Sequence, residues 1–223
     1  MLKTSTLDFP SRLSSVVFTQ GCDFHCPYCH NPDLAPAGDG TVPVASVLSF
    51  LERRKGVLDA VVLSGGEPTL QDGLEGFLAG AKGLGYLVKL DTNGSRPAVV
   101  EKLARAGLLD YVALDLKAAP DEYPGELAPA WLSAGVRETM AFLRDGGIPA
   151  EFRTTCVHPF IGPDSILALA RAASGRVPLY LQRFRPEKVL NPAFMALHPR
   201  QPGEAEIAGF QKIAQDFLPC HVR

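Results

Sequence analysis

Three cysteines lie within eight residues near the start of the chain, at Cys22, Cys26 and Cys29. Their spacing is C-x3-C-x2-C, and the aromatic residue Tyr28 directly precedes the third cysteine. Three thiolates can bind three irons of a four-iron cluster and leave the fourth iron open to a substrate or cofactor. The spacing therefore predicts a reactive site rather than a purely structural one.

A structural zinc site is the main alternative for these cysteines. Such a site needs four protein ligands, and His25 or His30 could supply the fourth. No second cysteine pair follows, because the next cysteine after Cys29 is Cys156. The ligand count favours a cluster and leaves zinc open.

Short apolar strands alternate with helical segments along the whole chain. Strands are predicted over residues 14–19, 60–63, 86–90, 111–116, 150–157 and 179–184, and helices over 44–54, 74–84, 98–106, 131–144, 165–173 and 204–217. This alternation is typical of a parallel sheet with helical crossovers. Because 223 residues fall short of the roughly 250 of an eight-unit barrel, we predict an α/β fold. We expect an open, partial (β/α)6 barrel similar to a TIM barrel, in a single domain over residues 1–223. Residues 118–129, rich in Pro, Glu and Ala, are expected to form a surface excursion.

Polar motifs follow three of the predicted strands. They are Ser64-Gly65-Gly66-Glu67-Pro68, Asp91-Thr92-Asn93-Gly94 and Asp115-Leu116-Lys117. The carboxyl ends of parallel strands form the ligand face of α/β folds. We therefore expect these motifs and the cysteine loop to converge on one cleft.

Each motif has a structural interpretation beside the chemical one. The glycines of the first motif would let the backbone approach a ligand, and Glu67 could pair with an ammonium, but the segment could also be a simple strand–helix turn. Asp91 and Asp115 could meet around a cation or a proton. Equally, Asp91 could cap a helix and Asp115 could pair with Lys117 in solvent.

Two further strand residues are candidates for ligand binding. Arg153 lies in the strand predicted over 150–157, and Gln182 in the strand over 179–184. A buried arginine needs an acidic partner, which can be a ligand carboxylate or a structural ion pair. Cys156 is predicted to be a small core residue and Cys220 a free thiol.

Composition limits the range of partners and compartments. The net charge of −2 gives no electrostatic reason to expect nucleic acid or an anionic membrane as a partner. No apolar run approaches the ~18 residues of a membrane span. Five cysteines, three of them clustered, suit a reducing compartment better than a disulfide framework. We therefore expect a cytoplasmic protein.

Taken together, the motifs resemble the radical S-adenosylmethionine (SAM) superfamily. The features that carry the resemblance are Thr19-Gln20-Gly21-Cys22, Tyr28-Cys29-His30-Asn31 and the three strand-end motifs. Within the superfamily the chain resembles the glycyl-radical-enzyme activases, and most of all the activating proteins of anaerobic ribonucleoside-triphosphate reductase. Residues 6–10 and 181–186 also look like that subgroup. The cysteine motif is highly specific for the superfamily, and the activase motifs are less specific.

The resemblance implies a role for each candidate residue. Cys22, Cys26 and Cys29 would bind a [4Fe–4S] cluster, and SAM would chelate the open iron. The implied SAM-binding residues are Tyr28 and His30 near the adenine, Gly66 and Glu67 at the methionine end, and Lys117 at the ribose or carboxylate. The set also includes Ser64, Gly65, Asp91, Asn93, Asp115, Arg153 and Gln182. Asp91, Thr92 and Asp115 would form a site for Na⁺ or K⁺. The implied reaction is reductive cleavage of SAM to a 5′-deoxyadenosyl radical, with flavodoxin or ferredoxin as electron donor and a glycine of a partner enzyme as target.

Two other functions stay open at this point. One is a stand-alone radical SAM enzyme that acts on a small molecule, similar to 7-carboxy-7-deazaguanine synthase. The other is a zinc-stabilised binding domain without catalysis. The absence of cysteines between Cys29 and Cys156 predicts a single cluster, whether the protein is an activase or a stand-alone radical SAM enzyme.

Overall fold

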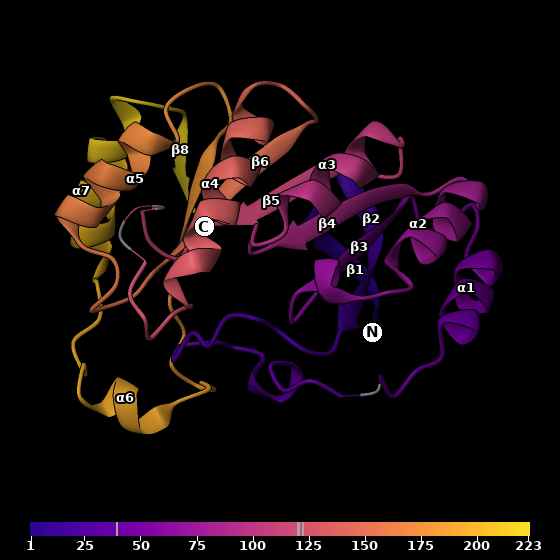
Figure 1. Cartoon of the computed structure of the whole chain (residues 1–223), viewed down its shortest axis with the longest axis horizontal. Coiled ribbons are helices and arrows are strands. Elements are labelled where there is room, and N and C mark those ends of the chain that lie inside the picture. Colours follow the sequence, from indigo (N-terminus) through magenta and orange to yellow (C-terminus); the bar gives the residue numbers. More distant parts are fainter. Residues whose placement is uncertain (39, 120, 122) are drawn as a thin grey trace.

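Eight strands form one sheet, and their spatial order follows the chain from β1 to β8 (Figure 1). The computed structural model describes residues 1–38, 40–119, 121 and 123–223. Its strands are β1 (Leu2–Phe9), β2 (Arg12–Thr19), β3 (Ala60–Gly65), β4 (Leu87–Thr92), β5 (Tyr111–Asp115), β6 (Ala150–Cys156), β7 (Leu179–Arg183) and β8 (Cys220–Val222). β1 pairs antiparallel with β2, and every other neighbouring pair is parallel.

A helical crossover follows each strand from β2 to β7. The helices are α1 (Val44–Arg53), α2 (Leu74–Gly83), α3 (Pro97–Arg105), α4 (Ala130–Arg144), α5 (Pro163–Ala172), the short α6 (Pro192–Ala196) and α7 (Glu204–Gln215). Figure 1 shows α1 and α2 at one end of the curved sheet and α5 and α7 at the other. Among the described residues β1 and β8 are not paired with each other, so the sheet is open. The predicted six-unit partial barrel is confirmed.

The strand registers bring the polar motifs to the same edge of the sheet. Thr19 at the end of β2 is opposite Gly65 at the end of β3, and Asp115 at the end of β5 is opposite Arg153 in β6. Residues 60–63 of β3 are almost completely buried because helices cover one face and the barrel interior the other. Burial on both faces explains why the strand is a continuous apolar run, which is the pattern that predicted it.

Three elements were not predicted from the sequence. β1 is an exposed edge strand in which Leu7 is 89% exposed, so it lacks the alternation of a half-buried strand. β8 has only three residues and α6 only five. Such short elements give no measurable periodicity.

The expectation of a surface excursion over residues 118–129 holds only in part, because Asp121, Gly125 and Glu126 are exposed while other residues of the segment are buried. Residues 120 and 122 of this segment lie outside the described residues, but Ala118, Tyr123 and Leu127 are buried. The Tyr123 ring packs on Phe24 with centroids 5.7 Å apart, and the Leu127 carbonyl accepts a hydrogen bond from the His25 backbone at 2.8 Å. The segment therefore supports the cysteine loop.

None of the helices in the described part of the chain is both long enough and apolar enough to cross a membrane.

Candidate functional site

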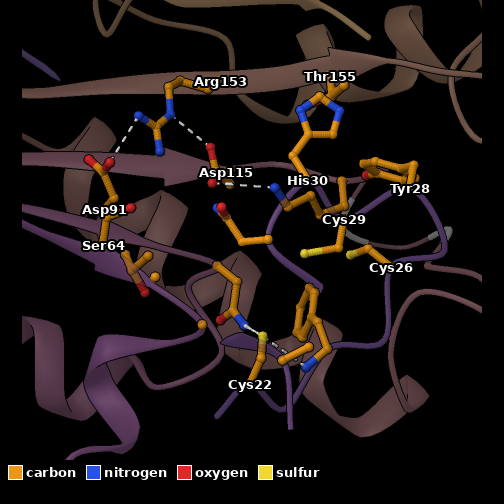
Figure 2. A pocket seen from close by; sticks show the side chains of 18 of the residues that line it. Cys22, Cys26, Tyr28, Cys29, His30, Ser64, Asp91, Asp115, Arg153 and Thr155 are labelled. Atoms are coloured by element: carbon orange, nitrogen blue, oxygen red, sulfur yellow. Dashed lines mark hydrogen bonds and ion pairs between the residues drawn. The ribbon is translucent and has the colours of Figure 1, made fainter. Parts of the chain in front are cut away.

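A cavity of about 330 Å³ lies at the carboxyl ends of the parallel strands (Figure 2). All the predicted site residues except Glu67 line this cavity, namely Cys22, Cys26, Tyr28, Cys29, His30, Ser64, Gly65, Gly66, Asp91, Thr92, Asn93, Asp115, Lys117, Arg153 and Gln182. The structure therefore brings together motifs that are up to 160 residues apart in the sequence. The volume of the cavity falls at the lower end of the roughly 300–1,000 Å³ that is typical of small-molecule sites.

Backbone hydrogen bonds fix the start of the cysteine loop. Gly21 has φ of +91°, a left-handed conformation that glycine adopts readily. Its N–H donates to the Leu34 carbonyl at 2.8 Å, and the next N–H, of Cys22, donates to Ala35 at 3.0 Å. The Gly21 carbonyl accepts from the Glu67 N–H at 2.8 Å. The loop is thus bonded both to the segment that follows it and to the end of β3.

The side chain of Asp23 bonds the cysteine loop to the end of β4. Its two oxygens accept from Asn93 Nδ2 at 2.8 Å and from Ser95 Oγ at 2.7 Å. Asn93 Nδ2 also lies 3.9 Å from the Cys22 sulfur, which accepts from the Phe24 N–H at 3.4 Å. Sequence reasoning missed Asp23, although its position directly after a ligand cysteine was a signal.

The three thiols are placed around the cavity rather than at one point. Figure 2 shows Cys22 apart from Cys26 and Cys29. In the described residues, no three His, Cys, Asp or Glu side chains are grouped so that they could hold a single metal ion. Three cysteines that each bind a different iron need not converge on one ion, so the donor set fits a cluster better than one zinc. Burial raises the pKa of Cys22 to about 12 and of Cys26 to about 11, so iron binding must release their protons.

Tyr28 lies buried against the aromatic residues of later loops. Its ring centroid is 5.6 Å from that of Phe160 and 6.4 Å from that of Phe184, and His30 lies 5.5 Å from Phe184. Among the described atoms the Tyr28 hydroxyl has no hydrogen-bond partner. A buried hydroxyl normally has one, so this oxygen, which is enclosed by protein atoms, is an unsatisfied polar group beside the cavity.

Glu67 does not line the cavity. Its carboxylate is fully buried and accepts four hydrogen bonds from the chain. The donors are Thr69 N at 3.0 Å, Thr69 Oγ1 at 2.6 Å, Thr92 Oγ1 at 2.8 Å and Asn93 N at 2.7 Å. Glu67 therefore joins the end of β3 to the end of β4. Burial raises its pKa, and the four donors oppose that rise.

The two glycines before Glu67 do allow a close backbone approach, but the approach is to the end of β2 and to the cysteine loop. A Cβ added to Gly65 would lie 2.3 Å from Thr19 N, and one added to Gly66 would lie 2.0 Å from the Gly21 carbonyl oxygen. Such distances are forbidden to real side chains. The glycine pair therefore lets β3 and the cysteine loop pack together at the edge of the cavity.

Five charged side chains form a row from the barrel interior to the cavity. This charged row consists of Lys89, Asp91, Arg153, Asp115 and Lys117. Arg153 lies between the two carboxylates, with Nη1 3.3 Å from Asp91 and Nε 2.7 Å from Asp115 (Figure 2). Lys89 pairs with Asp91 at 2.9 Å and Lys117 with Asp115 at 3.3 Å. Asp91 and Asp115 thus meet, as predicted, but through Arg153.

The row shifts the acidity of its members strongly. Burial raises the pKa of Asp115, but the charges of Arg153 and Lys117 outweigh burial and hold that pKa well below its usual range. Burial lowers the pKa of Arg153, and Asp115 and Asp91 more than reverse this, so the guanidinium stays charged. Lys89 was not among the predicted residues, although a lysine between Val88 and Leu90 in a buried strand has the same need for a partner as Arg153.

An open parallel barrel with three cysteines at the carboxyl ends of its strands defines the class of iron–sulfur proteins that use SAM. Residues 16–173 match the model of the Radical SAM superfamily, so the chain belongs to this superfamily and is an enzyme of the radical SAM type. Membership implies a [4Fe–4S] cluster and SAM.

The relatives found by sequence include glycyl-radical activases. The chain is 32% identical over 219 residues to a Methanocaldococcus jannaschii protein that carries the name "putative glycyl-radical enzyme activating enzyme", covering 96% of this chain and 90% of that one. It is 37% identical over 123 residues to a pyruvate formate-lyase-activating enzyme of Listeria monocytogenes, covering 50% and 49%. The chain thus matches only about half of the second relative.

The fold of the chain is similar to the folds of solved structures. SuiB of Streptococcus suis bound to S-adenosylmethionine superposes with a TM-score of 0.67 at 16% identity, over 93% of this chain and 49% of that one. At this identity the similarity shows the fold alone.

Proposed function

We propose that the protein is a radical SAM activase that forms a glycyl radical on a partner enzyme of the anaerobic ribonucleotide reductase type. The observation that carries the proposal is the convergence of the three cysteines and the three strand-end motifs on one cavity. The names of the two sequence relatives support the activase class. The ribonucleotide reductase partner rests on the resemblance of residues 6–10 and 181–186 to that subgroup.

Different residues of the cavity would bind different parts of the cluster and of SAM. Cys22, Cys26 and Cys29 would hold the cluster, and when bound the cluster and SAM supply one-electron cleavage of a C–S bond and hydrogen-atom abstraction. Lys117 offers a positive charge to the SAM carboxylate, because its ammonium has three donors and one ion pair, with Asp115, among the described residues. Tyr28 and His30, which both line the cavity, would lie near the adenine. Burial lowers the pKa of His30, so it is neutral at physiological pH.

The surroundings of the site fit a protein partner and a reducing compartment. The sheet is open between its two edge strands, and we infer that a glycine loop of the partner reaches the cavity from this side. Flavodoxin or ferredoxin would deliver the electron. All five cysteines are free, which agrees with a cytoplasmic location.

The test is anaerobic reconstitution with iron and sulfide, followed by reduction and addition of SAM. We expect about four irons per chain, release of 5′-deoxyadenosine, and a glycine-centred doublet in the electron paramagnetic resonance spectrum once the partner is added. Cys29→Ala should lose the cluster. Cys156→Ala, in the core away from the cavity, is the matched control and should keep its iron.

Each negative result has a distinct meaning. No SAM cleavage by a protein loaded with iron would contradict the enzymatic function. SAM cleavage without a glycyl radical on anaerobic ribonucleotide reductase or another glycyl radical enzyme would favour a small-molecule substrate.

A further inference from the structure

Both oxygens of Asp91 already lie in ion pairs with basic side chains of the protein. Oδ1 lies 2.9 Å from Lys89 Nζ but makes no hydrogen bond, and Lys89 Nζ donates to the Asp8 carbonyl at 2.7 Å. Oδ2 lies 3.3 Å from Arg153 Nη1. Asp91 is 8% exposed and Lys89 2% exposed, so solvent does not compete for these pairs. A metal ion could bind Asp91 only by displacing one of the two cations.

The other two expected cation ligands are occupied in the same way. Asp115 directs Oδ1 to Arg153 Nε at 2.7 Å and Oδ2 to Lys117 Nζ at 3.3 Å. Thr92 Oγ1 donates to Glu67 at 2.8 Å and accepts from the Gly94 N–H at 3.0 Å. The residues that resemblance assigns to Na⁺ or K⁺ therefore do not fit a metal ion, because each of their oxygens faces a proton donor or, in Thr92, makes two hydrogen bonds.

The charge balance of the barrel interior points the same way. Glu151 lies below the charged row, 3.7 Å from Lys89 and 3.1 Å from Arg223. Arg223 is 43% exposed, so solvent screens its charge. The remaining three basic side chains, Lys89, Arg153 and Lys117, face three carboxylates, Asp91, Asp115 and Glu151, and the interior charges therefore balance. Adding a monovalent cation would introduce a buried charge without a counter-charge, which is costly.

We propose that the Arg153 guanidinium replaces the monovalent cation in this protein, so that SAM binds without Na⁺ or K⁺. The inference rests on the proposed function, because it concerns SAM as the ligand. Arginine suits this place because its planar fork bonds two carboxylates at once and stays charged when buried.

The first test compares SAM affinity in different salts. The reconstituted protein is titrated with SAM by isothermal calorimetry in KCl, NaCl and N-methyl-D-glucamine chloride at equal ionic strength. We expect dissociation constants that agree within about twofold. Binding that is about tenfold or more weaker in N-methyl-D-glucamine than in KCl would overturn the proposal.

The second test measures the cation directly and does not depend on activity. The ²³Na relaxation rate of a NaCl solution is measured with and without the protein, before and after SAM is added. We expect no saturable increase that K⁺ can reverse. If the protein binds no SAM in any salt, the proposed function fails, whereas the ²³Na measurement still decides the question of the cation.

Two substitutions separate the charge of Arg153 from its shape. Arg153→Gln leaves two facing carboxylates without their shared cation, and its SAM affinity should become at least about tenfold stronger in KCl than in N-methyl-D-glucamine. Arg153→Lys retains the charge and should stay independent of K⁺. Circular dichroism establishes whether each variant folds, and if Arg153→Gln does not, the wild-type titrations remain decisive. A folded Arg153→Gln variant that gains no K⁺ dependence would contradict the proposed replacement.

Discussion

Replacing Gly66 with alanine tests whether the close packing of β3 against the cysteine loop is what builds the site. The added Cβ would lie 2.0 Å from the Gly21 carbonyl oxygen and 2.6 Å from its carbon. Both are backbone atoms, so no side-chain rotation relieves the overlap. Restoring a separation of 3.0 Å requires a shift of about 1 Å in Gly21, which directly precedes the ligand Cys22.

The expected loss of stability follows from two terms. Overpacking costs about 1–3 kcal/mol, and loss of the hydrogen bond from Glu67 N to Gly21 O leaves a buried donor unpaired at about 1–3 kcal/mol. The free energy of unfolding should therefore fall by roughly 2–6 kcal/mol. For a chain of this length each kcal/mol lowers Tm by about 2–4 °C, so the decrease should be about 4–24 °C.

The assay pairs thermal unfolding with iron content after anaerobic reconstitution. The matched control is Gly76→Ala, because Gly76 lies exposed in α2 and an added Cβ there meets no atom within 4 Å. That change should raise stability by up to about 1 kcal/mol and leave iron content unaltered. Gly66→Ala should bind less iron even well below its Tm, because Cys22 is displaced.

Wild-type Tm and wild-type iron content in Gly66→Ala would refute the reasoning. Lower Tm with full iron content would show that the glycine serves the fold but does not position Cys22.

Three further predictions concern the buried polar groups. Glu67→Gln replaces an acceptor oxygen with a donor that faces other donors, so urea unfolding should show a loss of about 2–5 kcal/mol in the free energy of unfolding. Glu52→Gln, at an exposed position in α1, should change it by less than about 0.5 kcal/mol, and equal values for the two variants would contradict the role of Glu67. The pKa of Asp115 is lowered on folding, so its stabilising effect is complete above its unfolded pKa of about 3.9 and is lost as pH falls through the lower folded value. The free energy of unfolding, measured between pH 2 and 7, should therefore decrease at the acid end, and Asp115→Asn should reduce that decrease. Burial raises the pKa of Cys156 to about 12 and of Cys220 to about 11, so at pH 7.5 neither thiol should react with a disulfide reagent until the protein unfolds. Rapid labelling of either thiol in the native protein, detected by mass spectrometry, would contradict this expectation.

Much of the fold was predictable because buried parallel strands are short apolar runs. The run Ala60-Val61-Val62-Leu63 is almost fully buried, and the motif after it had to lie at the carboxyl edge of the sheet. The convergence of the site followed from this one geometric rule. β1 could not be predicted in this way, because an edge strand that is paired on one side and exposed on the other needs no apolar pattern.

The partners of Glu67 could not be predicted, because they depend on how the ends of two strands meet. Thr69 is a local donor two residues along the chain, and such contacts are common. Thr92 and Asn93 are 25 and 26 residues away. A glutamate after two glycines looks the same in sequence whether it faces a ligand or the neighbouring strand.

The charged row was within reach of the sequence once the strand order was known. Lys89 and Asp91 are two residues apart in β4, as are Glu151 and Arg153 in β6, and residues at this spacing share a face of a strand. Both pairs combine opposite charges inside largely buried strands. Such repeated pairs indicate a buried ionic network rather than separate ligand contacts.

The buried polar groups thus divide into those that complete the fold and those left for a ligand. Glu67 and Arg153 form hydrogen bonds and ion pairs with other side chains and the backbone. Lys117, by contrast, lines the cavity with an ammonium that has one ion pair, with Asp115, among the described residues. Since burying donors without partners is costly, an anionic ligand would complete the bonding of Lys117. Lys117 therefore marks where an anionic group of that ligand would bind.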